Sequence, residues 1–473
     1  MSKAKTEKKR ARQAANGNKG AQAKKGKPAI WDGNVRDAAL TILLAVDQNQ
    51  AYSNLLLHQT IEKYKIDAKD RGLLTELTYG TLQYKMTLDY YLEPYVRGKL
   101  DDWVRWLLRL SLYQIVYLDK IPDHAAVNEA VEIAKHRARH RGVSATVNGI
   151  LRSILREGVQ DTTKIEDVAT RISIETSHPE WLVRRYIDAF GVEKTEDLLI
   201  ENNFPPLQTV RVNATKADTT KGLETLWEEK YAVRRSQTIP ECLHIVEGQP
   251  AKSQAFKDGV ITIQDESSMI PAYALDVEPG MRVYDMCSAP GGKTTHIAEK
   301  MNNEGELIAT DLHQHKMKLI QQNADRLGLS IIQTQVMDGR KATEAFEKES
   351  FDRILVDAPC SGLGVIRRKP DIKYTKSEAD FASLHAIQLD LLESAYELLK
   401  VGGKMVYSTC TIDKLENNGT VEAFLEKHPD LVLAPVVNAP EALTELRETG
   451  MMQVFPQDFN SDGFFVAAFE KKA

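Results

Sequence analysis

The 473-residue sequence predicts a multidomain protein in which an all-helical bundle precedes a doubly wound α/β domain. Between residues 31 and 160, apolar residues recur at the three- and four-residue spacing of amphipathic helices. From about residue 263, short apolar strands alternate with helical segments, which is the pattern of a parallel sheet covered by helices on both faces. Residues 161–262 mix short strands and helices and predict a small α/β subdomain.

The helical region contains six segments with apolar residues on one face. They span 35–46, 68–84, 86–96, 101–118, 125–138 and 142–157. Asp70 and Asp123 are acceptable helix starts, because a carboxylate near a helix N-terminus is stabilising. A concentrated basic run, KHRARHRG (135–142), is expected in a loop. It favours a nucleic-acid surface, and a merely solvated face is the alternative.

The middle subdomain is expected to hold a helix within 177–191, an extended segment at 205–213 and a strand-to-helix step over 214–229. The C-terminal region repeats strand then helix. Its strands are expected at 282–286, 306–311, 331–338, 353–358, 404–409 and 463–470, and its helices at 293–301, 315–328 and 383–400. Ligands bind such sheets beyond the carboxyl ends of the strands. The residues at those ends are Cys287, Asp311, Asp338, Asp357, Cys360 and Cys410.

The formal net charge of −5 is unevenly distributed. Residues 1–30 hold ten Lys or Arg and one acid, Glu7, so this tail carries +9 and the rest of the chain −14. The tail is rich in Lys, Ala and Gly, which predicts a disordered segment with RNA phosphates as one partner. A tail that only raises solubility is the equal alternative.

Composition predicts neither a membrane segment nor a disulfide framework. No stretch approaches the roughly 18 consecutive apolar residues of a membrane helix, and the Lys-rich N-terminus lacks the apolar core of a secretory signal. Four cysteines, at 242, 287, 360 and 410, are widely spaced and form no CxxC pair that would suggest zinc. We therefore expect free thiols in a reducing cytoplasm, no metal, and a small buried apolar role for Cys242.

A glycine-containing loop, DMCSAPGGKTTHIA, follows the first strand of the C-terminal region. Gly291 and Gly292 allow a ligand to approach the backbone, and the next helix begins with unpaired N–H groups. The loop is not a phosphate-binding P-loop, because that motif requires glycine where Cys287 stands.

Three acids follow successive strands of the same region: Asp311, Asp338 and Asp357. Asp311 lies about 20 residues beyond the glycines, where an acid can accept both ribose hydroxyls. Carboxylates without an arginine clamp suit a cationic nucleoside better than a polyphosphate, and S-adenosylmethionine has that character. Each acid alone is more often a cap or turn residue. Three together favour a ligand site.

Several motifs resemble those of a known family. CSAPGGKT (287–294), DAPCSGLGVIRRKPDIKY (357–374) and YSTCTIDKLENN (407–418) are similar to signatures of the RNA cytosine-C5 methyltransferases of the NOL/NOP/SUN type. DRGLLTELTYGTLQ (70–83), LYQIVYLDKIPDHAAVNEAVEIAK (112–135) and VNGILRSILR (147–156) are similar to the NusB-like RNA-binding domain. The combination is typical of bacterial small-subunit (16S) ribosomal RNA methyltransferases.

The resemblance implies three parts. These are a NusB-like domain over 31–160, an RNA-contacting subdomain over 161–262 and a Rossmann-like, S-adenosylmethionine-dependent domain over 263–473, with the tail 1–30 outside the resemblance. The positions that match cofactor-binding elements are Cys287, Ser288, Ala289, Pro290, Gly291, Gly292, Lys293, Asp311, Asp338 and Asp357. Cys410 corresponds to the nucleophile and Cys360 to the cysteine linked to product release. The implied partner is small-subunit ribosomal RNA, and nothing in the architecture predicts more than a monomer.

Two thiols suit this reaction. Attack of a thiolate on C6 of cytosine makes C5 nucleophilic enough to accept a methyl group, which is covalent catalysis. Cys410 then needs a depressed pKa or a nearby base. We expect Asp357 to protonate or position the base, Lys293 to contact the site, and Cys360 to assist release. DNA cytosine-C5 methyltransferases carry their nucleophile in a Pro-Cys motif, which would nominate Cys360, but the resemblance to the RNA enzymes favours Cys410.

Two other functions stay open at the level of sequence: the same chemistry on transfer RNA, and a NusB-like RNA-binding factor without catalysis. The charged segment 367–374, RRKPDIKY, is expected to be a lid that offers cations to RNA phosphates, or else a plain solvated loop.

Overall fold

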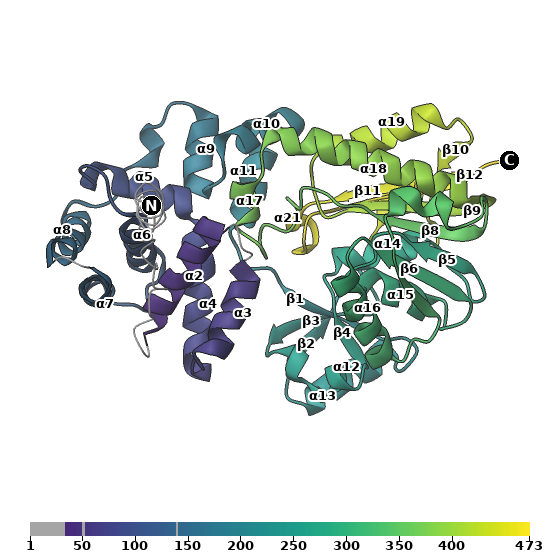
Figure 1. The fold of residues 1–473 in the computed structure, drawn as a ribbon, viewed down its shortest axis with the longest axis horizontal. Helices are drawn as coiled ribbons and strands as arrows, with labels where there is room; N and C mark the ends of the chain where they lie inside the picture. Colours follow the sequence, from purple (N-terminus) through teal and green to yellow (C-terminus); the bar gives the residue numbers. More distant parts are fainter. Residues whose placement is uncertain (1–33, 50–52, 139–140) are drawn as a thin grey trace, which may run out of the picture. The chain divides into compact units, whose positions relative to one another are not determined.

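The computed structural model describes residues 34–49, 53–138 and 141–473 (Figure 1). The basic tail at 1–30 lies outside the described residues. The chain divides into two compact units. One consists of 1–51, 55–78 and 94–158, and the other of 52–54, 79–93 and 159–473.

The first unit is built from helices. Its elements are most of α3 (Ser53–Lys63) and α4 (Ala68–Gln83), together with α2 (Val35–Asn49), α6 (Asp102–Tyr117), α7 (Asp123–Arg137) and α8 (Arg141–Glu157). Helix α6 packs against α2, α7 and α8, and its Leu108 is fully buried. The predicted helices are confirmed, although α4 begins two residues before Asp70. Helix α3 was not predicted, because its Leu55 is 56% exposed and the apolar residues of this helix therefore do not all mark its buried face.

The basic run at 135–142 is helical at both of its described ends, where the sequence predicted a loop. Its first three residues are the last turn of α7, and Arg141 begins α8. Arg137 is an internal cation, since its side chain is 8% exposed and pairs with Asp37 of α2. Its guanidinium also donates to Thr41 Oγ1. This arginine therefore stabilises the helical unit and is not free to meet a phosphate.

The second unit begins with a helical layer. It contains the end of α4, α5 (Lys85–Leu92), α9 (Val168–Thr176), α10 (Glu180–Phe190) and α11 (Val192–Glu201). Thr87 Oγ1 donates to the Ile174 carbonyl at 2.6 Å, and the Met86 N–H donates to Ser177 Oγ at 2.8 Å. These bonds join the early segment 79–93 to residues that follow it by about ninety positions.

A small antiparallel sheet follows. Its strands are β1 (Gln208–Val212), β2 (Ala232–Arg235), β3 (Cys242–Glu247) and β4 (Ile261–Ile263), in the order β2-β3-β1-β4. Helix α12 (Thr219–Glu228) packs on it, and short α13 (Gln254–Lys257) precedes β4. The fully buried Val210, Leu226 and Leu243 form its core. The predicted strand-to-helix step from β1 to α12 is confirmed.

The large sheet holds eight strands in the order β10-β12-β9-β8-β5-β6-β7, with β11 paired to β12. They are β5 (Arg282–Asp285), β6 (Glu306–Asp311), β7 (Ile332–Val336), β8 (Phe351–Asp357), β9 (Leu399–Thr409), β10 (Leu431–Leu433), β11 (Met451–Val454) and β12 (Phe464–Lys471). All six predicted strands are present. The sheet is mixed, however, because only β5 to β9 run parallel, and β12 is antiparallel to β9, β10 and β11. The short link between β11 and β12 cannot make a parallel crossover, which needs about a dozen residues.

Helices cover both faces of this sheet (Figure 1). They are α14 (Ile270–Ala274), α15 (Gly292–Lys300), α16 (Gln314–Leu327), α18 (Glu378–Leu398) and α19 (Thr420–Lys427), with short α20 (Thr444–Thr449). Two further short helices, α17 (Ile372–Thr375) and α21 (Pro456–Phe459), pack toward the helical layer: Ile372 shares an apolar cluster with α9, α10 and α11, and α21 contacts α11. Successive strand residues point to opposite faces. Accordingly Val283 and Leu355 pack with α14, α15 and α16, whereas Tyr284 and Ile354 pack with α18. The sheet is therefore buried on both sides and leaves its ends for ligands.

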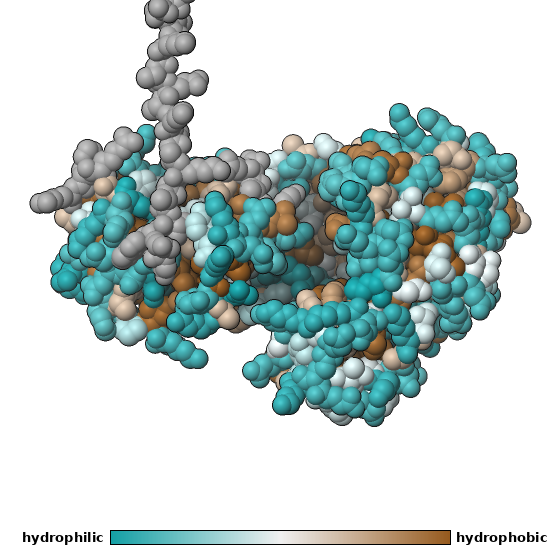
Figure 2. Space-filling view, turned by 60° about the horizontal axis from the view of Figure 1, so that its bottom comes forward, coloured by the Kyte–Doolittle hydropathy of each residue, from teal (hydrophilic) through white to brown (hydrophobic). Residues whose placement is uncertain are grey.

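In the part of the chain that the structure describes, we find no helix with the length and apolarity needed to cross a membrane. On the face drawn in Figure 2, hydrophilic residues cover most of the surface, and hydrophobic residues form smaller separate areas.

Candidate active site

The glycine loop joins the end of β5 to the start of α15. Gly291 has φ +103°, and a Cβ atom there would lie 3.2 Å from Ile320 Cα of α16. At Gly292 the nearest atom to such a Cβ would be 3.8 Å away, so the backbone requires glycine only at 291. The Ser288 N–H and Oγ both donate to the Thr310 carbonyl of β6, at 2.9 and 2.8 Å. The loop is thus held by α16 on one side and β6 on the other.

A cavity of about 200 Å³ opens beside this loop. One wall comes from the glycine loop and the ends of β5 and β8: Asp285, Cys287, Ser288, Ala289, Pro290, Gly292, Lys293 and Asp357. A second wall is Ile263, the last residue of β4, with Gln264, Asp265 and Ser268, which follow it. The cavity lies at the carboxyl ends of β5 and β8, where the strand order switches, as expected for a ligand site.

The second wall and Asp285 were missed by the sequence analysis. Residues 263–268 were treated as the start of a domain, although the polar run QDESS directly after a short strand was a usable signal. Asp285 was counted as part of an apolar strand. An acid in a strand buried on both faces was also a signal, because a buried carboxyl needs a partner.

Asp285 is fully buried, and its carboxyl is only half satisfied. Thr294 Oγ1 donates to Oδ2 at 2.7 Å, while Oδ1 is buried without a hydrogen-bond partner among the described residues. Burial raises the pKa of Asp285 to about 7, and the Asp357 carboxylate adds to this effect against the Thr294 hydrogen bond. A cationic group in the cavity would stabilise the ionised form.

Lys293 and Asp357 form an ion pair at the cavity wall, with 2.8 Å between Nζ and Oδ2. Ser408 Oγ of β9 donates to the other carboxylate oxygen, also at 2.8 Å. Burial lowers the pKa of Lys293, but the negative charges of Asp357, Cys410 and Asp285 and the hydrogen bond to Asp357 together outweigh burial, so this pKa lies above its usual value. The loop lysine is therefore held as a cation between β8 and β9.

Two thiols meet next to this ion pair. Cys360 follows β8 and Cys410 follows β9, and their Sγ atoms are 3.4 Å apart. Both side chains are partly exposed free thiols. A hydrogen bond from Cys360 lowers the pKa of Cys410 against the opposing effect of burial, and Lys293 also lowers it. The pKa of Cys360 is raised by the same hydrogen bond and by burial. Of the two, Cys410 is the more readily ionised.

A short π-helical turn, Leu415–Gly419, braces both cysteine loops. Glu416, which is fully buried, accepts from the Ser361 N–H at 2.8 Å and from Gln388 Nε2 at 3.0 Å. Asn417 accepts from Thr409 Oγ1 at 2.6 Å and donates to the Thr411 carbonyl at 3.0 Å. Three of these four bonds fall on a residue next to Cys360 or Cys410, namely Ser361, Thr409 and Thr411. The sequence analysis assigned no role to this turn.

Asp311 and Asp338 are near the ends of β6 and β7, as predicted, but they do not line the cavity. Asp311 accepts from the His313 N–H at 3.1 Å. Asp338 caps the 3-10 turn Gly339–Glu344 and pairs with Arg340 at 2.7 Å. Both make turn or cap contacts, and their role toward a cofactor stays a prediction.

The segment 367–374 is not a lid. The Arg367 side chain is 1% exposed and pairs with Glu201 at 3.1 Å. Arg368 bridges Asp265 and Asp462, at 2.6 and 2.7 Å. The prediction of free cations for phosphates is therefore wrong for both arginines, because internal carboxylates neutralise them.

Comparisons with known proteins match the same layout. Family models match residues 33–156 (NusB family), 178–252 (RsmF/B-like methyltransferase, ferredoxin-like domain) and 272–470 (16S rRNA methyltransferase RsmB/F). The chain is 50% identical over 443 residues to the "probable ribosomal RNA small subunit methyltransferase B" of Bacillus subtilis (strain 168), covering 93% of this chain and 99% of that one.

Two solved structures are also similar. The crystal structure of PH0851 superposes with a TM-score of 0.78 at 29% identity and covers 94% of this chain and 100% of its own. A methyltransferase homolog protein from Pyrococcus horikoshii gives a TM-score of 0.57 at 26% identity, over 65% of this chain and 100% of its own. The predicted fold class, a NusB-like bundle, a small α/β subdomain and a Rossmann-like methyltransferase domain, is confirmed.

Proposed function

The chain belongs to the family of ribosomal RNA small subunit methyltransferases B, and we propose that it methylates carbon 5 of a cytosine in small-subunit (16S) ribosomal RNA. Membership of this family confirms two predictions, that the protein is a methyltransferase and that S-adenosylmethionine is its cofactor. The observation that carries the proposed chemistry is the pair of thiols, Cys360 and Cys410, beside the Lys293–Asp357 ion pair.

The cavity suits this cofactor. The buried, unpaired Oδ1 of Asp285 matches a ligand that brings a cationic donor, such as an ammonium group. When bound, S-adenosylmethionine supplies an electrophilic methyl group. We assign its binding to the loop Cys287–Lys293 and to Asp285, with Asp311 accepting the ribose hydroxyls and Asp338 contributing at the end of β7.

Cys410 is the proposed nucleophile. Its lowered pKa supports this assignment, because the thiolate is the reactive form. Its sulfur bonds to C6 of the cytosine, the C5–C6 π electrons shift into the ring, and N3 takes up a proton. The Lys293–Asp357 pair keeps a proton at that edge of the site, and we propose that N3 takes its proton from this pair. C5 is then electron-rich enough to take the methyl group.

Cys360 is the proposed partner for release. After methylation the proton on C5 must leave and the bond between C6 and Cys410 Sγ must break. The hydrogen bond with Cys410 and the negative charge of Cys410 raise the pKa of Cys360, and both are lost once Cys410 is bonded to C6. Cys360 then releases its thiol proton to solvent, and the resulting thiolate takes the C5 proton. The electron pair of that C–H bond restores the double bond, Cys410 leaves as a thiolate, and N3 returns its proton to the Lys293–Asp357 pair. The 3.4 Å between the two sulfurs supports the proposal that both act on one base.

Methyl transfer from labelled S-adenosylmethionine to unmodified small-subunit ribosomal RNA tests the reaction and the substrate together. Nucleoside mass spectrometry is expected to show 5-methylcytidine in that RNA and none in transfer RNA. Methylation of transfer RNA alone would keep the chemistry and overturn the substrate. No transfer to either RNA, by protein that binds the cofactor, would favour an RNA-binding factor without catalysis.

The proposal includes the organisation of the chain. We propose that residues 31–160 and 161–262 serve RNA binding, that 263–473 performs catalysis, and that the enzyme acts in the cytoplasm as a monomer. Sedimentation of the full chain would reveal a dimer if the monomer assignment is wrong.

A further inference from the structure

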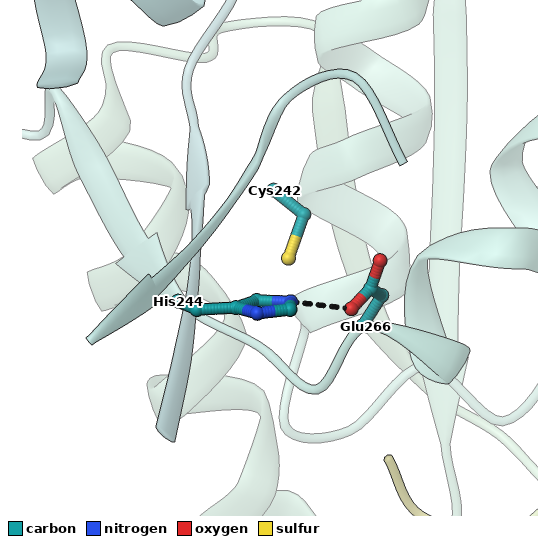
Figure 3. A group of neighbouring side chains, drawn as sticks. All are labelled: Cys242, His244 and Glu266. Atoms are coloured by element: carbon teal, nitrogen blue, oxygen red, sulfur yellow. Dashed lines mark hydrogen bonds and ion pairs between the residues drawn. The ribbon is translucent and has the colours of Figure 1, made fainter. Parts of the chain in front are cut away.

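Three side chains with metal-binding atoms converge in the small sheet, outside the cavity. Cys242 and His244 lie two residues apart on β3 and therefore point to the same face. Glu266 reaches them from the turn after β4. One ligand atom from each of the three lies within 4.8 Å of the other two, and Figure 3 shows the sulfur above the His244–Glu266 contact.

The three side chains are buried, and hydrogen bonds satisfy them incompletely. Cys242 is 0% exposed, Glu266 2%, and the His244 side chain 12%. His244 Nε2 contacts Glu266 Oε2 at 2.7 Å, and Ser236 Oγ donates to the second carboxylate oxygen. His244 Nδ1 is buried without a hydrogen-bond partner among the described residues. Hydrogen bonding by the neutral Cys242 thiol does not explain why these three side chains are grouped together.

The charges around the cluster favour a cation. The Glu266 carboxylate places a negative charge beside the Cys242 thiol. A divalent cation would be attracted by this charge and would bind the sulfur as a thiolate, because a metal-bound thiol is deprotonated. One thiolate and one carboxylate would balance its two positive charges, with a neutral imidazole as the third ligand.

We propose that Cys242, His244 and Glu266 bind a thiophilic divalent transition-metal ion, of which zinc is the most suitable. Thiolate, imidazole and carboxylate are the ligand types of zinc, which bind at about 2.0–2.3 Å, and a fourth position is left for water. On binding, the Cys242 thiol releases its proton to solvent as the sulfur–metal bond forms. The imidazole proton moves from Nε2 to Nδ1, so Nε2 offers its lone pair, and the contact between Nε2 and Glu266 is replaced by two bonds to the metal.

The position of the cluster gives the ion a structural effect on the cofactor cavity. Glu266 follows Gln264 and Asp265, which line that cavity. Glu241, next to Cys242, pairs with His296 and Lys300 of α15 at 2.7 and 3.0 Å. A metal ion would therefore link β3 to the cavity wall and to the helix that follows the glycine loop, and we expect it to raise the thermal unfolding temperature of the second unit.

The sequence did not signal this site, because two ligands are separated by one residue and the third follows 22 positions later. The usual zinc spacing of paired cysteines is absent. Cys242 was expected to be only a small buried apolar residue. Its burial is confirmed, but its neighbours are a histidine and a carboxylate.

Cobalt(II) is the probe that tests the proposal in the full-length protein. The chain is first stripped with a chelator and then titrated with Co²⁺ while the near-ultraviolet thiolate-to-cobalt band is recorded. We expect one Co²⁺ per chain, and at least about tenfold weaker binding in Cys242→Ser and His244→Ala, since each lacks one of three ligands. Release of one Co²⁺ per chain when zinc is added would show that zinc competes for the same site.

The matched control is the double variant Cys360→Ala, Cys410→Ala, because those neighbouring thiols could also bind cobalt. This variant is expected to keep the band. Loss of the band in the control but not in Cys242→Ser would overturn the proposal, as would wild-type protein that binds no Co²⁺. S-adenosylmethionine binding by each variant verifies its fold. If Cys242→Ser fails to fold, His244→Ala alone decides, and an unchanged band in it contradicts the site.

Discussion

Cys360 Sγ lies 3.4 Å from Cys410 Sγ, although the two residues are 50 positions apart in the chain. The contact arises because β8 and β9 are parallel neighbours with Asp357 opposite Ser408, so the loops that follow them meet. A thiol that donates a hydrogen bond to another thiol stabilises the thiolate of its acceptor. The pair therefore has unequal acidity, and Cys410 is the member prepared to attack.

Replacing Cys360 with Ala is expected to shift the ionisation of Cys410 to higher pH. The wild-type pKa of Cys410 is lowered chiefly by the hydrogen bond from Cys360, so removing the donor raises it. One hydrogen bond to a charged group is worth about 1.5–3 kcal/mol, so the shift is expected to be about one pH unit or more. The rate of iodoacetamide modification of Cys410, followed by peptide mass spectrometry against pH, measures it. An unchanged profile would show that Cys360 does not stabilise the thiolate.

Replacing Glu416 with Ala is expected to slow methyl transfer by about a hundredfold without weakening cofactor binding. The carboxylate anchors the Ser361 N–H and Gln388, and its loss lets the loop of Cys360 move relative to Cys410. A misplacement of about 1 Å can cost on the order of 10²-fold in rate. Single-turnover rates and the Kd for S-adenosylmethionine separate the two effects. A weaker Kd with a normal rate would contradict the positioning role.

Replacing Asp285 with Asn is expected to weaken S-adenosylmethionine binding about ten- to a hundredfold, the value of one or two charge-assisted contacts. Because the pKa of Asp285 is about 7, its ionised form accumulates as the pH rises through that value. Wild-type affinity should therefore increase from pH 6 to pH 8. The variant keeps an acceptor for the Thr294 hydroxyl but cannot ionise, so it should lack the part of the rise in affinity that comes from Asp285. Calorimetric titration at both pH values measures it, and equal pH dependence in both proteins would count against a contact with the cofactor.

Replacing Arg211 with Gln is expected to destabilise the second unit by about 3–5 kcal/mol, because it leaves a buried charge unpaired. Arg211 is fully buried on β1 and pairs with Glu299 of α15 at 2.8 Å. It also donates to the Gly292 carbonyl at 3.0 Å. The thermal unfolding midpoint measures the loss. Arg211→Met combined with Glu299→Leu should recover much of it, and failure of both variants alike would show that packing, not charge, is responsible.

Local patterns in the sequence predicted most of the fold. Apolar spacing located the helices of the first unit except α3, and six strands of the large sheet, because burial on one or both faces leaves a period in the sequence. Strand direction has no such period, so the antiparallel placement of β12 was not predicted. Strands β2, β3, β4, β10 and β11 were not predicted individually either, and all of them except β3 have only three or four residues, which carry too little pattern.

The site was predictable where one motif supplied several residues, as in the loop 287–293. It was not predictable where the partners are distant in the chain. The cations of 367–374 looked free in sequence, but Arg367 and Arg368 meet Glu201, Asp265 and Asp462 only after folding. Glu416 likewise acquires its contacts from tertiary structure alone.

The most direct test of the account is the identity of the cysteine that bonds to RNA. Cys360→Ala, incubated with small-subunit ribosomal RNA and S-adenosylmethionine, is expected to accumulate a denaturant-resistant protein–RNA adduct because release is blocked. After nuclease and protease digestion, mass spectrometry should place a methylated cytidine on the peptide that contains Cys410. The Cys410→Ala variant should form no adduct and still bind the cofactor. An adduct on Cys360 in Cys410→Ala would contradict the assignment and make Cys360 the nucleophile.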